Sequence, residues 1–225
     1  MDNVISDLKK VLMVPIHKEG HKMIAIFGAV AFFLALLNST LGIIGLIATL
    51  WCIYFFRNPE RFTLAGENDV VSPADGIVNF IEVGALPPAE LGLDKKRKWI
   101  KIGIFLNVFD VHVNRVPISG KVIKVEYREG EFLSASLEGS SDKNERSSIL
   151  VKTTNGQEVV FSQVAGLIAR RIVNELKEGE LVRTGQVYGI IKFGSRVDVY
   201  LPHDAEIKTI AGQRMVGGET IIARI

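Results

Sequence analysis

The dipeptide Gly194-Ser195 lies between two runs of strand-forming residues and offers the most distinctive chemistry in this sequence. Glycine leaves its own carbonyl unshielded and tolerates backbone angles that other residues resist, so the Ser195 hydroxyl can attack the Gly194 carbonyl. The attack would turn the peptide bond into an ester, and β-elimination followed by hydrolysis would leave a pyruvoyl group at position 195. Because Gly-Ser is also a common turn pair, the dipeptide alone leaves a self-processing site and a plain turn both open.

Self-cleavage needs a base that removes the hydroxyl proton of Ser195, and histidine suits that task near neutral pH. His112 is the best candidate, because it lies in a strand-like run that is crowded with polar side chains. A carboxylate commonly orients such a histidine, and we expect Asp75 in that role, with Asp110 and Asp198 as rivals. Both main candidates also have a structural interpretation: His112 as a hydrogen-bonded core residue, and Asp75 as a turn aspartate that bonds its own backbone.

Basic residues near these positions could meet an anionic headgroup or phosphate. They are Lys192, Arg196, Arg170, Arg171 and Arg115. We take Arg196, Arg115 and Lys192 as the candidate substrate-binding set, and a solvated surface position is the alternative for each.

The composition argues against several classes of protein. The chain has 225 residues and a net charge of +2, which gives no footprint of nucleic-acid binding. It has one cysteine, Cys52, and four histidines without paired metal-ligand spacing, so neither a disulfide framework nor a metal site is predicted. The length suits one domain with an appendage or two small domains.

An uncharged apolar stretch runs from Met23 to Phe56 and is too long for an ordinary core helix, so it predicts a membrane segment. One tilted helix is one topology, and a hairpin that turns at residues 38–40 is the other. Basic residues flank the stretch on both sides, which places both ends in the cytoplasm and favours the hairpin. We therefore expect a membrane anchor in residues 1–57 and a soluble domain, 58–225, on the cytoplasmic side of the cell membrane.

The soluble part is predicted to be mostly β, of the α+β class with few helices, because short β-branched runs alternate with Gly, Pro and Asn. The expected strands are 76–83, 99–106, 120–128, 148–153, 158–163, 189–193, 197–201, 206–210 and 220–224. Apolar residues at helical spacing predict one helix, Gly166–Leu176. Similar segments that start at Pro73, Pro117 and Pro202 share the pattern P-x-x-[G/A]-x-[V/I], which favours a barrel-sandwich-like β domain.

Together these motifs resemble one family, the short bacterial form of phosphatidylserine decarboxylase. The matching stretches extend along nearly the whole chain, and the last of them holds the Gly-Ser processing site of the family. They are residues 54–60, 71–76, 105–115, 144–146, 163–171 and 191–202.

The resemblance implies a proenzyme that cuts itself between Gly194 and Ser195 into a β chain, 1–194, and an α chain, 195–225, which stay together as a heterodimer. The processing set of the family carries over as Asp75, His112 and Ser195. Longer members have a second histidine three residues after the first, and this chain has Arg115 there. His112 is therefore expected to serve both in processing and as the proton donor in catalysis. Further self-association into a homo-oligomer stays open.

The implied activity is decarboxylation of the membrane lipid phosphatidylserine to phosphatidylethanolamine. The covalent pyruvoyl group derived from Ser195 is the implied cofactor, and it would form a Schiff base with the lipid amine and accept the electrons released with CO₂. A membrane anchor suits this substrate, since withdrawing a lipid chain from the bilayer costs ~0.8 kcal/mol per CH₂.

Two other functions remain open at this point. A lipid decarboxylase of the same kind could act on archaetidylserine, and a membrane-tethered barrel-sandwich carrier or adaptor would use Gly194-Ser195 only as a turn. Soluble pyruvoyl decarboxylases of amino acids fit less well, because they would not need residues 23–56.

Overall fold

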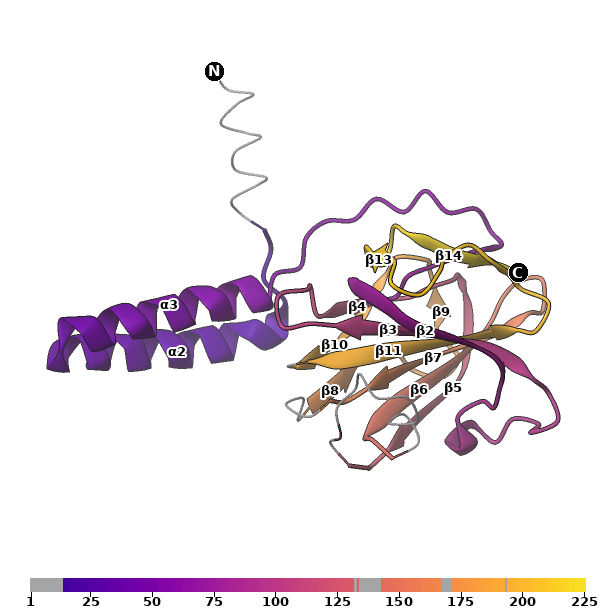
Figure 1. The fold of residues 1–225 in the computed structure, drawn as a ribbon, viewed down its shortest axis with the longest axis horizontal. Helices are drawn as coiled ribbons and strands as arrows, with labels where there is room; N and C mark the ends of the chain where they lie inside the picture. Colours follow the sequence, from indigo (N-terminus) through magenta and orange to yellow (C-terminus); the bar gives the residue numbers. More distant parts are fainter. Residues whose placement is uncertain (1–13, 132, 134–142, 167–170, 193) are drawn as a thin grey trace, which may run out of the picture. The chain divides into compact units, whose positions relative to one another are not determined.

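The computed structural model describes residues 14–225 apart from 132, 134–142, 167–170 and 193 (Figure 1). The chain divides into two compact units, one up to Glu60 and the other Arg61–Ile225.

The first unit contains two helices, α2 (Lys18–Leu37) and α3 (Ser39–Phe55), joined at Asn38. Asn38 caps α3, because its side-chain oxygen accepts a hydrogen bond from the backbone of Thr40 at 2.8 Å. The side chains of α2 are mostly exposed, and among the described residues α2 is the helix long and apolar enough to cross a membrane. α3 is apolar but shorter.

Small residues let α2 and α3 approach closely. A Cβ at Gly42 would lie 2.6 Å from Ala35, and a Cβ at Gly45 would lie 2.7 Å from Ala31. Because these contacts run in opposite order along the two helices, the helices are antiparallel. Glycine and alanine thus form the same kind of contact that draws apolar helices together in lipid.

The second unit is built on β-sheets, which confirms the prediction of a mostly β fold. Its main sheet has the strand order β13-β2-β3-β11-β7-β6-β5-β9 and is strongly curled in Figure 1. The strands of this sheet are β2 (Gly76–Ala85), β3 (Trp99–Leu106), β5 (Gly120–Arg128), β6 (Arg146–Lys152), β7 (Glu158–Val164), β9 (Leu181–Val182), β11 (Ser195–Pro202) and β13 (Arg214–Met215). A large apolar cluster that draws on most of these strands forms the core.

Two three-stranded sheets complete the unit, in the orders β4-β10-β8 and β1-β14-β12. Their strands are β1 (Asp69–Val71), β4 (Val113–Arg115), β8 (Arg171–Asn174), β10 (Val187–Lys192), β12 (Glu206–Ile207) and β14 (Ile221–Arg224). A short 3-10 helix, η1 (Ala89–Leu91), lies in the connection between β2 and β3.

The predicted helix Gly166–Leu176 is wrong where the structure describes it, because Arg171–Asn174 forms strand β8. Residues 167–170 of that prediction lie outside the described residues. Ile172 and Val173 are β-branched and pair with Ile191 and Ile190 of β10. Pairing with a neighbouring strand therefore prevailed over a helical spacing that rested on a few apolar residues.

Candidate functional site

Ser195 is the first residue of β11, and its side chain is completely buried. Side chains alternate between the two faces of a strand, so Ser195 shares the face of Val197 and Val199, which belong to the core. Among the described residues, no hydrogen-bond partner reaches the Ser195 hydroxyl. A buried hydroxyl without a partner costs about 1–3 kcal/mol, which marks this serine as a functional candidate.

Gly194 has a φ of 59°, in the left-handed region that favours glycine. No atom lies within 4 Å of the position that a Cβ would take. β10 ends at Lys192 in one sheet and β11 begins at Ser195 in another. The Gly194–Ser195 bond therefore lies at a corner where the chain passes between sheets.

His112 is fully buried and directly precedes β4. Its ring Nδ1 lies 2.9 Å from the backbone oxygen of Asp110. Because a carbonyl oxygen only accepts hydrogen bonds, Nδ1 carries the proton and Nε2 holds the lone pair that a general base needs. The backbone oxygen of His112 also accepts a hydrogen bond from Ile191, near the end of β10, so His112 lies beside the strand that leads to the corner.

Asp110, a predicted rival for orienting His112, acts through its backbone, while its carboxylate holds the preceding turn. The carboxylate accepts a hydrogen bond from the Asn107 backbone at 2.9 Å and pairs with Arg214. The Asp110 backbone in turn donates to the Asn107 oxygen at 3.0 Å. The turn that carries His112 is thus fixed at both ends.

Asp75 lies in the turn before β2, where its carboxylate accepts hydrogen bonds from Arg61 and from the backbone of Gly217, both at 2.7 Å. The register of the sheet brings this turn to the end of β3 that faces the start of β11, because Phe105 pairs with both Ile77 and Arg196. Asp75 and Ser195 therefore lie at the same end of the sheet. An orienting contact from Asp75 to His112 stays a prediction.

Arg115 lies near Asp75, in a cluster of opposite charges. Its guanidinium donates to the backbone oxygen of Gly185 at 2.9 Å. Burial lowers the pKa of Arg115, nearby Arg61 lowers it further, and the Asp75 and Glu219 carboxylates oppose the change. The cluster combines two arginines with two carboxylates close to the predicted processing residues.

The other two predicted cations occupy different surroundings. Arg196 is fully buried. Because it is the next residue after Ser195 in the strand, its guanidinium lies on the opposite face of the sheet, where it pairs with Asp198 at 2.6 Å. Lys192 is half-buried at the end of β10, opposite Arg171. Lys192 therefore precedes the corner directly, whereas the charge of Arg196 is already engaged on the far side.

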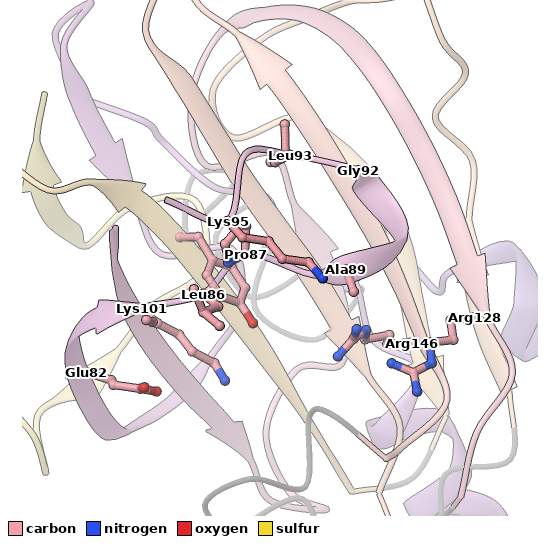
Figure 2. A pocket seen from close by; sticks show the side chains of 12 residues that line it. Glu82, Leu86, Pro87, Ala89, Gly92, Leu93, Lys95, Lys101, Arg128 and Arg146 are labelled. Carbon is pink, nitrogen blue, oxygen red and sulfur yellow. The ribbon is translucent and has the colours of Figure 1, made fainter. Parts of the chain in front are cut away.

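A cavity of about 650 Å³ lies on that opposite face, under the connection that contains η1 (Figure 2). Its lining includes Tyr200 of β11. Like Arg196, Tyr200 lies on the opposite face of the strand from Ser195. The cavity is therefore separate from the surroundings of the Ser195 hydroxyl.

Comparison with known proteins gives the family. The family model described as phosphatidylserine decarboxylase matches residues 48–223. The chain belongs to the phosphatidylserine decarboxylase family. It is 56% identical to the phosphatidylserine decarboxylase proenzyme of Rickettsia akari (strain Hartford) over 208 residues, which cover 92% of this chain and 89% of that protein. It is 54% identical over 208 residues to the protein of the same name from Rickettsia bellii (strain OSU 85-389), again over 92% of this chain and 89% of the relative.

The sequence analysis missed a polar link below the site of this phosphatidylserine decarboxylase family member. Gln163 of β7 donates to the Asn114 side chain of β4 at 2.8 Å and to the backbone oxygen of Val173 at 3.2 Å. Gln163 also pairs with Val197, close to the start of β11. The link joins the two sheets that meet at the corner. Its signal in the sequence is that Asn114 and Gln163 are polar residues flanked by strand-forming residues.

Proposed function

We propose that the chain is a proenzyme that cuts itself between Gly194 and Ser195 and then decarboxylates phosphatidylserine to phosphatidylethanolamine. One observation supports it most: the buried Ser195 hydroxyl lacks a partner among the described residues and directly follows a left-handed glycine. An ordinary Gly-Ser turn would leave its hydroxyl in water or bonded to the backbone. The residues present thus suit conversion of Ser195 into a pyruvoyl group.

Cleavage begins when the Ser195 Oγ adds to the carbonyl carbon of Gly194 and His112 Nε2 takes the hydroxyl proton. The C–N bond then breaks, the Ser195 nitrogen receives a proton, and the two residues are joined by an ester. Removal of the Ser195 α-proton expels the Gly194 carboxylate, which becomes the end of the β chain. Water then replaces the nitrogen, ammonia leaves, and the α chain, 195–225, starts with the pyruvoyl group.

The pyruvoyl group supplies an electron sink for the pair released when CO₂ leaves the lipid. His112 is already held beside the corner by Asp110 and Ile191, so it can return a proton to the α-carbon of the substrate. We assign Arg115 and Lys192 to attraction of the lipid phosphate and Asp75 to orienting His112. Arg196 fits a different task, because its pairing with Asp198 fixes the start of β11.

The anchor completes the proposal. We propose that α2 and α3 form a hairpin in the cell membrane, and that the catalytic domain, 58–225, is a barrel-sandwich on the cytoplasmic side. The antiparallel contacts of Gly42 and Gly45 with α2 support the hairpin, and the basic flanks of residues 23–56 support the side.

The test is the intact mass of the full chain and of two variants, Ser195→Ala and Ser119→Ala. Ser119 is an exposed serine that hydrogen-bonds to Thr184, so it is a matched control. We expect wild type and Ser119→Ala to give the α chain 195–225, lighter by one ammonia than a fragment that starts with serine. Ser195→Ala should remain whole.

The lipid is tested on cleaved protein by CO₂ release from phosphatidylserine and from archaetidylserine in mixed micelles. We expect release from phosphatidylserine, with slower release from the ether lipid. Faster CO₂ release from archaetidylserine would change the proposed substrate to that lipid and leave the proposed mechanism unchanged. A wild-type chain that stays intact while folded would reject self-processing and favour the adaptor.

A further inference from the structure

The cavity of about 650 Å³ on the outer face of the sheet has an unusual set of charges (Figure 2). Among the described residues, four cations line it, Lys95, Lys101, Arg128 and Arg146, together with one carboxylate, Glu82. The four cations come from different parts of the chain: the connection after η1, β3, β5 and β6. The fold thus gathers positive charge that the sequence scatters.

Two of these cations form a rigid floor. The Arg146 side chain is only 2% exposed and donates two hydrogen bonds to Glu90, at 2.6 and 2.5 Å. The Lys101 side chain is 9% exposed, and its ammonium lies 3.5 Å from Asp198. Because Glu90 and Asp198 hold these two cations by ion pairs, the cations are positioned before any ligand binds.

Ion pairs also hold the buried charges below the cavity. Asp198 pairs with both Arg196 and Lys101, while Glu90 pairs with Arg146. Asp198 therefore serves two cations, and Glu90 serves one. Glu82, which lies opposite Lys101 on β2, is exposed to water and screened by it. Lys95 and Arg128 add two further exposed positive charges at the rim.

The remaining wall of the cavity is apolar. Leu86, Pro87 and Leu93 come from the connection around η1 and line the side across from the sheet. A ligand that satisfies both walls carries an anionic group next to a small apolar part. Guanidinium and ammonium groups that converge in this way suit a phosphate.

We propose that this cavity binds the phosphate group of an amphiphilic anion, with the glycerol and first acyl carbons of a phospholipid against the apolar wall. The site is separate from the processing centre. Tyr200 in its lining is five residues along β11 from Ser195, roughly 16 Å at 3.3 Å per residue, and on the other face. The proposal therefore does not rest on the activity of Ser195.

The first probe is inorganic phosphate, measured by equilibrium dialysis with the full chain in nanodiscs of neutral lipid. The double variant Lys95→Gln/Arg128→Gln removes the rim cations and leaves the ion pairs of the floor intact. The double variant Lys121→Gln/Lys152→Gln makes the same change of charge at exposed positions on β5 and β6. We expect the rim variant to lose about tenfold in affinity and the control to lose less than about twofold.

The second probe is dihexanoyl phosphatidylglycerol, below its micelle concentration. We expect it to bind more tightly than inorganic phosphate, and Leu86→Ser to weaken the lipid without weakening phosphate. Equal affinities for the lipid and for inorganic phosphate would overturn the proposal of an amphiphilic ligand and identify free phosphate as the ligand. Absence of saturable phosphate binding at millimolar concentrations, or equal losses in the two double variants, would overturn the site.

The same dialysis on uncleaved Ser195→Ala separates the two proposals. Binding there with no cleavage activity would support the cavity independently. If a wild-type chain cuts itself but does not bind phosphate, the proposed phosphate site is wrong and the processing mechanism is unaffected.

Discussion

The substitution Glu90→Gln tests whether a single buried ion pair holds the connection between β2 and β3 on the sheet. Glu90 accepts two hydrogen bonds from Arg146 and a third from Ser148 at 2.8 Å. The glutamine keeps the size of the side chain but removes its charge, so the buried guanidinium of Arg146 loses its ion pair with Glu90. Breaking a buried pair in this way typically costs about 3–5 kcal/mol.

The lower end of that range applies, because the Glu90 side chain is 11% exposed and water can reach one edge of the pair. About 3 kcal/mol corresponds to a fall in Tm of roughly 6–12 °C for a unit the size of Arg61–Ile225. The fall in Tm is measured by thermal unfolding of the full chain, followed by the far-ultraviolet circular dichroism signal of the β-sheets. The Arg97–Glu158 pair is a control, since its side chains are 39% and 28% exposed. Glu158→Gln should cost less than about 1 kcal/mol.

The pH dependence gives a second readout for Glu90. Burial alone would raise the pKa of Glu90, but hydrogen bonds from Arg146 and Ser148 outweigh it and hold that pKa below its ordinary value. A lowered folded-state pKa means that the stabilisation is complete above the unfolded value of about 4.3 and is lost as the pH falls through the folded value. Glu90→Gln should therefore flatten the acid limb. A loss no larger than that of Glu158→Gln, or full additivity with Arg146→Met, would refute the reasoning.

Three further outcomes are expected. Gly76→Ala should abolish folding and processing, because the new Cβ would lie 2.2 Å from the Phe105 oxygen at a φ of 153°. Gly84→Ala is the control: its φ is 87° but the space around it is open, so it should lower the free energy of unfolding by about 1–2 kcal/mol and still be cleaved. His112→Gln should fold but stop the appearance of the α chain on denaturing gels, and normal cleavage would exclude this histidine as the base. A hydrogen bond from an arginine of β14 lowers the pKa of Asp69, so its contribution is present above the unfolded pKa of about 3.9 and lost below the folded one. Asp69→Asn should thus shift the acid unfolding midpoint upward, and an unchanged midpoint would show that the pair contributes nothing.

The regular strands were predictable from sequence. Trp99–Leu106 and Gly120–Arg128 begin and end where their β-branched runs predict, since glycine, proline or polar residues bound each run. The apolar stretch from Met23 to Phe56 predicted an apolar anchor, with a turn at residues 38–40 as the favoured alternative; the structure has two helices joined at Asn38, whose side chain caps the second. Local composition decides these features, so reading the chain segment by segment suffices.

Other features depend on contacts between distant segments. The Glu90–Arg146 pair joins residues far apart in the sequence, and nothing in either segment identifies its partner. The opposite faces of Ser195 and Arg196 follow only once both are known to lie in one strand, β11. Ile172 and Val173 were misassigned because a four-residue strand is stabilised by its neighbour β10, which no helical or strand period reveals.

The corner at Gly194 changes what unfolding means for this molecule. A chain cut there would hold its last segment by non-covalent contacts alone: β11 is inserted between β3 and β7, β13 lies beside β2, and β14 lies beside β1, and all three strands add side chains to the core. Unfolding of the cut form then releases two molecules, so its stability depends on protein concentration, whereas that of the uncut form does not. A released 195–225 segment would have to find its place in the sheet again by a second-order encounter. If the proposed cut occurs after folding, the uncut chain can place β11 in the sheet as part of a single molecule.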